Sequence, residues 1–225
     1  WGEVARRLAH EIKNPLTPIQ LSAERLRHKL LRKLPETEAG VVDRATYTIV
    51  QQVEAMKAMV NDFSDYARSP EMQAEPLELD RLVSEVMDLY AGTRPASGIA
   101  VELNAAQARV SGDPLRLRQV IHNLVKNALE ATEGRPGAQV LVSTRLVEDA
   151  ERPQVELAIR DNGGGIDEDL IGRLFEPYVT TKPKGTGLGL AIVKKIVEEH
   201  SGIIWAENMD GGARVAVRLP CSRAT

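Results

Sequence analysis

The stretch LAHEIKNPLTPIQL, Leu8–Leu21, has the apolar spacing of an α-helix but also contains two prolines and one histidine. A proline inside a helix lacks the N–H donor and crowds the carbonyl four residues earlier, at a cost of roughly 3 kcal/mol or more. Pro15 and Pro18 are therefore expected to loosen the helix directly after His10. A loosened helix suits a histidine that must be presented to a partner.

Apolar residues recur at spacings of three and four over residues 1–68, which predicts two long helices with a break at LPETEAG. One alternative is that Asn14 caps a new helix with Pro15 at its first position. The first apolar series passes this point without a break and favours one kinked helix instead. The two series are Val4, Leu8, Ile12, Leu16, Ile19, Ala23, Leu26 and Leu30, and then Val42, Ala45, Ile49, Val53, Met56, Val60, Phe63 and Ala67.

Two helices joined by a short loop form an antiparallel hairpin. A single hairpin leaves each apolar stripe half covered, and a second copy would cover the rest. The periodicity therefore predicts a homodimer built as a four-helix bundle. A coiled-coil spacer without any chemistry has the same periodicity and is the alternative at this point.

His10 lies about 200° around the helix from Leu8, which we take as part of the buried seam, so His10 is expected to be exposed. Most exposed histidines are ordinary surface residues. A nucleophilic histidine needs a neutral ring with a free lone pair and a carboxylate for its other N–H, and Glu11 offers that carboxylate. Asn14, one turn after His10, could orient a water molecule or a substrate.

The composition limits the classes of function. The chain of 225 residues has a net charge of −3, which disfavours a broad nucleic-acid contact surface. Its single cysteine, Cys221, excludes an internal disulfide bond and suits a reducing compartment. No apolar run reaches the roughly 18 residues of a membrane span, so no membrane contact is expected from this chain. Because it begins at Trp1 rather than Met, we expect a fragment of a longer protein.

The helical periodicity ends at SPEMQAEP, residues 69–76, a polar segment with prolines that we interpret as a linker. Beyond it, helix and strand periodicities are mixed, and Asp113 with Pro114 forms a good helix start. This mixture predicts an α/β sandwich with helices on one face of a mixed sheet. Helices are expected near residues 80–90, from 114 and near 188–200, and strands near 99–103, 139–146, 155–160, 203–207 and 214–219.

Polar side chains in this second region suit a nucleotide site. HNLVKNALEA places Asn123 and Asn127 on one helical face with Glu130, a set that suits a Mg²⁺ ion bridging phosphates, although paired surface amides are as common. IRDNGGGID ends an apolar strand in Asp161, followed by three glycines. A carboxylate there can accept the exocyclic amine of adenine, whereas guanine presents an acceptor at that position.

KPKGTGLGLAIVKKIVEE places Gly185, Gly187 and Gly189 directly before an apolar-periodic helix. Glycine N–H groups at a helix N-terminus form a cradle for anions such as phosphate. The spacing fits neither a Rossmann fingerprint nor a P-loop, and an ordinary glycine-rich turn would explain it if it stood alone.

Taken together, the segments AHEIKNP, HNLVKNALEA, DNGGGID, LFEPYVTTK and GTGLGLAIVKKIVEEHSG closely resemble, in order and spacing, the five sequence boxes of two-component sensor histidine kinases. The resemblance covers nearly the whole chain, and HEIKNPLTPIQLSAERL is most similar to nitrogen-regulation sensors of the NtrY type. It implies a dimerisation and phosphoacceptor domain over residues 1–70. It also implies an ATP-binding domain over residues 71–225, with the fold shared by gyrase, MutL and Hsp90 ATPases.

The same resemblance implies roles for individual residues. His10 matches the phosphoacceptor, Glu11 its acidic partner and Asn14 the residue used to dephosphorylate the partner protein. Asn127 matches the Mg²⁺ ligand, and a flexible lid is implied over residues 176–185. Three lysines are candidate contacts to the phosphates of ATP, although each could equally be a solvated surface residue: Lys126, Lys182 and Lys184. The other residues implied in ATP binding are Asn123, Asp161, Gly163, Gly165, Phe175, Gly185, Thr186, Gly187, Leu188 and Gly189.

The implied activity is ATP-dependent autophosphorylation of His10, then phosphoryl transfer to an aspartate in the receiver domain of a response regulator, and dephosphorylation of that regulator. ATP and Mg²⁺ are the implied cofactors, and the implied setting is a cytoplasmic fragment of a protein anchored in the bacterial inner membrane. A dimerising ATPase or clamp of the same fold is disfavoured by His10 on its proline-containing helix. A non-catalytic dimeric scaffold is disfavoured by the intact Asn127 and Asp161.

Overall fold

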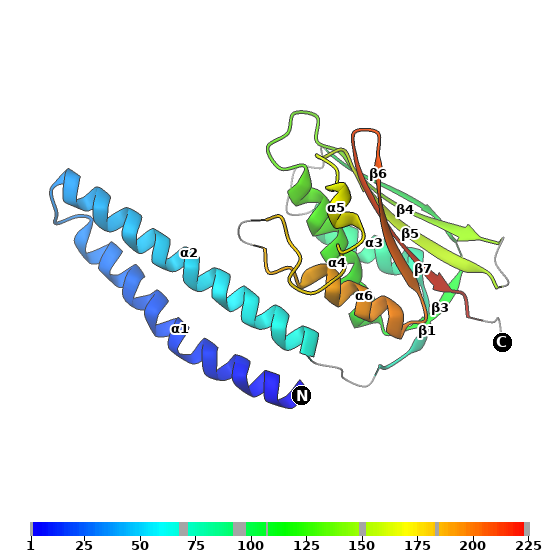
Figure 1. Ribbon diagram of the computed structural model, residues 1–225, viewed down its shortest axis with the longest axis horizontal. Helices are drawn as coiled ribbons and strands as arrows, with labels where there is room; N and C mark the ends of the chain where they lie inside the picture. The colour runs from blue at the N-terminus through cyan, green and yellow to red at the C-terminus, as the bar shows by residue number, and fades with distance from the viewer. Residues whose placement is uncertain are drawn as a thin grey trace. The chain divides into compact units, whose positions relative to one another are not determined.

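The computed structural model describes residues 2–67, 72–91, 98–106, 108–148, 152–182 and 185–222. The chain forms two compact units, one of residues 1–70 with 180–188 and the other of residues 71–179 with 189–225. The first unit is built mainly from two long helices, and the second from helices packed on a sheet (Figure 1). Within these described ranges, none of the helices is apolar over a length sufficient to traverse a bilayer.

Helices α1 (Gly2–Leu30) and α2 (Glu36–Ala67) form the antiparallel hairpin that the apolar periodicity predicts (Figure 1). α1 continues through Pro15 and Pro18 as one helix. The alternative in which Asn14 caps a second helix is therefore wrong. Apolar contacts before and after the prolines hold the helix together where their missing N–H groups cannot.

The buried seam of the hairpin follows a seven-residue repeat. In α1, Ala9, Leu16 and Ala23 are at most 5% exposed, and in α2, Thr46 and Val53 are each 4% exposed. A seven-residue repeat keeps one side of each helix against its partner, as in a coiled coil. The alanines in α1 allow the two helices to approach closely.

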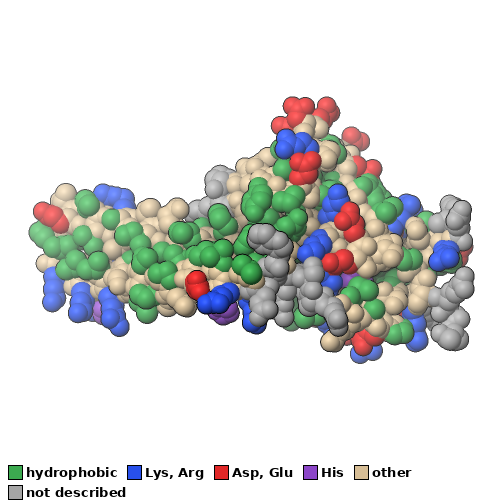
Figure 2. All heavy atoms as spheres, turned by 60° about the horizontal axis from the view of Figure 1, so that its bottom comes forward, with side chains coloured by type: hydrophobic (Ala, Val, Ile, Leu, Met, Phe, Trp, Pro, Cys, Tyr) green, Lys and Arg blue, Asp and Glu red, His purple; other side chains and the backbone are tan. Residues whose placement is uncertain are grey.

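Seven of the sixteen residues in the two predicted apolar series are exposed. Leu8, which we took as part of the seam, is 46% exposed, because the seam passes through its neighbour Ala9 instead. The expectation that a single hairpin covers its apolar stripes only in part is confirmed, and a band of hydrophobic side chains remains on the hairpin surface (Figure 2). Its members include Val4, Leu8, Ile19, Leu26, Ile49 and Met56.

The second unit contains a five-stranded sheet in the order β2-β4-β5-β7-β6. β2 and β4 are parallel and the other neighbours are antiparallel, so the sheet is mixed, as predicted. Helices cover one face of it (Figure 1). The helices are α3 (Leu79–Ala91), α4 (Pro114–Ala131) and α6 (Gly189–Glu199), and the strands are β2 (Ile99–Asn104), β4 (Val140–Val147), β5 (Gln154–Asp161), β6 (Ile203–Met209) and β7 (Gly212–Pro220).

Three short elements lie outside the predicted set. β1 (Glu75–Glu78) pairs with β3 (Arg109–Gly112) in a separate two-stranded sheet, and α5 (Glu168–Ile171) follows the glycine-rich loop. The interpretation of residues 69–76 as a linker is thus wrong for its last two residues, which belong to β1. Each of these elements has only four residues, too few for a periodicity to appear in the sequence.

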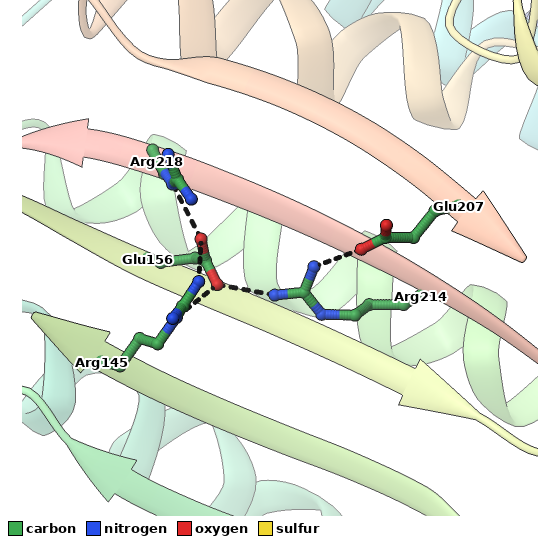
Figure 3. Close-up of polar contacts among 5 residues, drawn as sticks. All are labelled: Arg145, Glu156, Glu207, Arg214 and Arg218. Atoms are coloured by element: carbon green, nitrogen blue, oxygen red, sulfur yellow. Dashed lines mark hydrogen bonds and ion pairs between the residues drawn. The ribbon is translucent and has the colours of Figure 1, made fainter. Parts of the chain in front are cut away.

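A buried carboxylate lies on the sheet face opposite to the helices. Glu156 in β5 is 1% exposed and accepts hydrogen bonds from three arginines on neighbouring strands (Figure 3). Glu156 Oε1 lies 2.8 Å from Arg145 Nε and 2.6 Å from Arg214 Nη2, and Glu156 Oε2 lies 2.7 Å from Arg218 Nε. Burial alone would raise the pKa of Glu156, but the hydrogen bonds from Arg145 and Arg218 outweigh it and lower that pKa to about 2.

We expect Glu156→Gln to lower the free energy of unfolding of the second unit by about 3 kcal/mol at pH 7, since each pKa unit corresponds to about 1.4 kcal/mol. A depressed carboxylate pKa stabilises the fold above its unfolded value of 4.5, and this contribution is lost as the pH falls from 4.5 towards 2. The difference between parent and variant should therefore shrink below pH 4.5. Urea unfolding followed by the fluorescence of Trp205, in a Trp1→Phe background, measures the free energy of unfolding of both proteins. Trp205 is a suitable probe because its ring centre lies 5.0 Å from the guanidinium carbon of Arg218, a partner of Glu156.

Glu207→Gln is the matched control. Glu207 contacts Arg214 on the same face but is 46% exposed, so its loss should cost less than about 1 kcal/mol. Equal losses for the two variants, or a Glu156 effect that does not change with pH, would contradict the assignment.

Candidate functional site

The first group of candidate residues lies on the surface of α1. His10, Glu11 and Asn14 are all exposed, as the spacing predicts for His10. His10 and Asn14 lie one turn apart, so they share one face of the helix. Glu11 accepts a hydrogen bond from Arg7 Nε at 3.3 Å. The expectation that Glu11 orients the imidazole of His10 stays a prediction.

The second group lies on α4, which begins as predicted. The carboxylate of Asp113 accepts from the N–H groups of Leu115 and Arg116 at 3.0 and 3.2 Å. This cap satisfies two of the free donors at the start of the helix. The apolar face of α4 is buried, which fixes how the helix is turned about its axis. Its buried members include Ile121, Leu124, Val125 and Ala128.

With that face buried, the polar side chains of α4 have fixed positions. Asn123 and Asn127 are half-buried, at the border between the core and the surface. Lys126 is mostly exposed, and its Nζ lies 3.8 Å from Glu130 Oε1 one turn later. Both amides thus belong to the edge of the packed unit, whereas Lys126 has the exposure of a surface residue.

Asp161 ends β5 and is 8% exposed. Its Oδ1 accepts the N–H of Gly163 at 2.8 Å, and its Oδ2 makes no hydrogen bond within the described part of the chain. A Cβ on Gly163 would lie 2.7 Å from the carbonyl oxygen of Ala131, at the end of α4. Only glycine therefore lets the loop approach α4 this closely. The result is a carboxylate with one oxygen fixed by the backbone and one oxygen available to a ligand.

Two asparagines hold this glycine-rich loop to its surroundings. Asn162 Nδ2 donates to the carbonyl of Gly137 and its Oδ1 accepts from the N–H of Gln139, both at 2.7 Å. Asn208, at the end of β6, makes the corresponding pair of bonds with the N–H and carbonyl of Ile166, also at 2.7 Å. Each side-chain amide thus pairs with the backbone as a second strand would.

The sequence did not point to either residue. Asn162 lies inside DNGGGID, so a turn-forming role could have been considered. Asn208 lies outside all five segments, and its partner is 42 residues away. A contact between residues so distant leaves no local pattern in the sequence.

The remaining candidates follow the loop. Phe175 is half-buried after α5, and Lys182 is exposed. Gly185, Thr186, Gly187 and Leu188 belong to the helical unit, in which Thr186 Oγ1 donates to Asp62 Oδ2 at 2.6 Å. Gly189 is the first residue of α6 in the α/β unit. Lys184 and part of the expected lid lie outside the described residues.

The donor set fits a Mg²⁺ ion that is held mainly by phosphates. Among the residues that the structure describes, no group of three or more His, Cys, Asp or Glu side chains is arranged to hold a metal. Mg²⁺ keeps several waters and needs only one or two protein oxygens when phosphates supply the rest. The amide oxygen of Asn127 on α4 would supply one such protein oxygen.

Two family profiles match the chain. The His Kinase A (phospho-acceptor) domain matches residues 1–71, and the histidine kinase-, DNA gyrase B- and HSP90-like ATPase matches residues 112–223. The nitrogen regulation protein NtrY of Azorhizobium caulinodans is 41% identical over 222 residues, which cover 97% of this chain and 28% of that protein. The chain therefore spans less than a third of that relative.

Two solved structures resemble nearly the whole chain. Full-length ShkA in complex with AMPPNP has a TM-score of 0.71 at 25% identity, over 99% of this chain and 46% of that one. Histidine kinase ThkA in complex with the response regulator protein TrrA has a TM-score of 0.69 at 29% identity, over 98% of this chain and 62% of that one.

Proposed function

Because this chain belongs to the sensor histidine kinases, as a catalytic core of the NtrY type, we propose that it phosphorylates itself on His10 and passes the phosphoryl group to a response regulator. We further propose that residues 1–70 form the dimerisation and phosphoacceptor domain and residues 71–225 the ATP-binding domain. The observation that carries the proposal is the pairing, in one chain, of an exposed His10 on a helical hairpin with the available Oδ2 of Asp161.

The proposed reaction is an in-line displacement. The unprotonated ring nitrogen of His10 attacks the γ-phosphorus of ATP, the bond between that phosphorus and the bridging oxygen to the β-phosphate breaks, and ADP leaves. Glu11 accepts a hydrogen bond from the other ring N–H and so favours the positive charge that the imidazole gains. A carboxylate oxygen of an aspartate in the regulator then attacks the phosphorus, the bond between phosphorus and the His10 ring nitrogen breaks, and the free imidazole leaves.

The ATP-binding residues have separate tasks in this proposal. Asp161 Oδ2 accepts the exocyclic amine of adenine, and the N–H groups of Gly185, Gly187 and Gly189 bind phosphate oxygens ahead of α6. Asn127 would hold Mg²⁺, which neutralises charge on the phosphates when bound. The structure of ThkA with the response regulator protein TrrA supports the expected class of partner for this chain, namely a response regulator.

Incubation with Mg²⁺ and ATP labelled at the γ-phosphate tests the proposal. Label retained on the protein supports a histidine kinase. Label released as free phosphate without a phosphoprotein would favour a clamp-like ATPase instead. No use of ATP at all would favour a scaffold and overturn the proposal.

We also expect a homodimer at micromolar concentration. The exposed hydrophobic band on the hairpin supports this, since a second copy would cover it. Sedimentation velocity should give a dimer for the parent. The pair Ile19→Glu and Met56→Glu should give a monomer, because both side chains are 47% exposed on the hairpin. Arg25→Glu, an exposed polar site on α1, is the control, and a monomeric parent would contradict the bundle.

Asn14→Ala should slow dephosphorylation of the phosphorylated regulator about tenfold or more, while phosphorylation of His10 is largely kept. A neutral amide on the same helical face as His10 can orient the attacking water without acting as a base. The measurement is the decay of phosphorylated regulator in the presence of ADP.

Thr17→Ala is the control, because Thr17 is exposed in the next turn of the same helix. It should clear the regulator at the rate of the parent. If Asn14→Ala does the same, Asn14 is only a polar surface residue ahead of a proline.

A further inference from the structure

The loop that carries the glycines proposed to contact adenine is held by one strand side chain near each of its ends, in addition to the bonds that Asn162 makes with Gly137 and Gln139. At its start, Asp161 Oδ1 accepts the N–H of Gly163 at 2.8 Å. Near its end, the side chain of Asn208 makes both hydrogen bonds to Ile166, each 2.7 Å long. The first attachment is made by a residue proposed to contact ATP, whereas the second is made by a residue in another strand.

The strand register puts these two attachments in one row. Asp161 of β5 pairs with Ala213 of β7, and Ala213 in turn pairs with Asn208 of β6. Residues directly opposite each other in neighbouring strands point to the same face of a sheet. Asp161 and Asn208 therefore project from the same face of the sheet, near the C-terminal ends of β5 and β6. The loop between Gly163 and Ile166 crosses from one to the other.

Gly165 lies directly against Asn208, in a backbone conformation that favours glycine. Its φ of +76° is a left-handed conformation, and a Cβ there would lie 3.0 Å from Asn208 Oδ1. The glycine is thus required by both its own backbone and its approach to Asn208. The contact is specific to an amide, because one group must supply both an acceptor for the Ile166 N–H and a donor for its carbonyl.

We propose that Asn208 is a positioning residue for nucleotide binding: it holds the loop from Gly163 to Ile166 in the conformation that accepts adenine. The inference rests on the proposed ATP-binding function of Asp161. Without the amide, the loop would occupy the binding-competent conformation for only part of the time. The apparent affinity for nucleotide falls in proportion to that fraction.

The test compares ATP and ADP binding by calorimetry for the parent, Asn208→Ala and Asn208→Asp. Loss of two backbone contacts should weaken ATP about tenfold in Asn208→Ala. ADP should weaken by the same factor, because the loop is proposed to contact the adenine and not the γ-phosphate. Asn208→Asp keeps the size and the acceptor but loses the donor, so it should weaken both nucleotides about threefold.

A second readout separates positioning from a general structural effect. The KM for ATP in autophosphorylation should rise about tenfold in Asn208→Ala, with the rate at saturating ATP within about twofold of the parent. Asn104→Ala, an exposed asparagine at the end of β2, should change neither value. A lower rate at saturating ATP with an unchanged KM would overturn the positioning role, as would parent-like binding by both Asn208 variants.

These results also separate the inference from the proposed function. If the parent binds ATP and Asp161→Asn does not, parent-like binding by both Asn208 variants removes only the Asn208 assignment. A parent that binds no ATP would overturn both.

Discussion

His10→Gln is expected to abolish incorporation of label from γ-labelled ATP while ATP binding stays at the level of the parent. Glutamine has no ring nitrogen with a free lone pair, so the proposed nucleophile is lost. His10 is exposed on α1, and its replacement should not disturb the buried seam at Ala9 and Leu16. Phosphorylation is measured on the protein, and ATP binding is measured by calorimetry on the same sample.

The chemistry of the linkage gives a second check on this assignment. Phosphohistidine is lost in acid and survives base, so the label on the parent should show the same behaviour. His28→Gln is the matched control, since His28 is a second exposed histidine on α1 and should be dispensable. Label that persists in His10→Gln, or that maps to His28, His122 or His200, would refute the phosphoacceptor assignment.

Asp161→Asn is expected to weaken ATP binding about 100-fold or more with the fold intact. The Oδ1 of asparagine can still accept the Gly163 N–H, so the start of the loop should stay attached. The other position of the side chain changes from a charged acceptor to an amide donor, which would face the donor of the adenine amine. Calorimetry measures the affinity, and circular dichroism checks that the sheet is unchanged.

Asp169→Asn is the control for this prediction. Asp169 is an exposed carboxylate in α5, a few residues after the same loop, and its replacement removes the same charge. It should bind ATP as the parent does. Affinity near that of the parent in Asp161→Asn would remove Asp161 from the adenine site.

The elements with regular periodicity were predictable because their signals are local. The apolar series gave both helices of the hairpin, and the start of α4 was readable from Asp113 and Pro114, which act within one turn. The exposure of His10 followed from helical geometry alone, although the seam was assigned one residue away from its true position at Ala9. Short elements such as β1 and α5 were missed because four residues cannot display a period.

By itself, the sequence determined the order of the longer helices and strands, the exposed face of α1 and the candidate residues of the five segments. Each depends on residues within a few positions of one another. Only the tertiary structure decided that Asn208 holds Ile166 across 42 residues, and that one buried Glu156 is paired with arginines from two other strands. The physical reason is that strand pairing and side-chain contacts join residues whose separation along the chain is arbitrary, so no local pattern records which of them will meet.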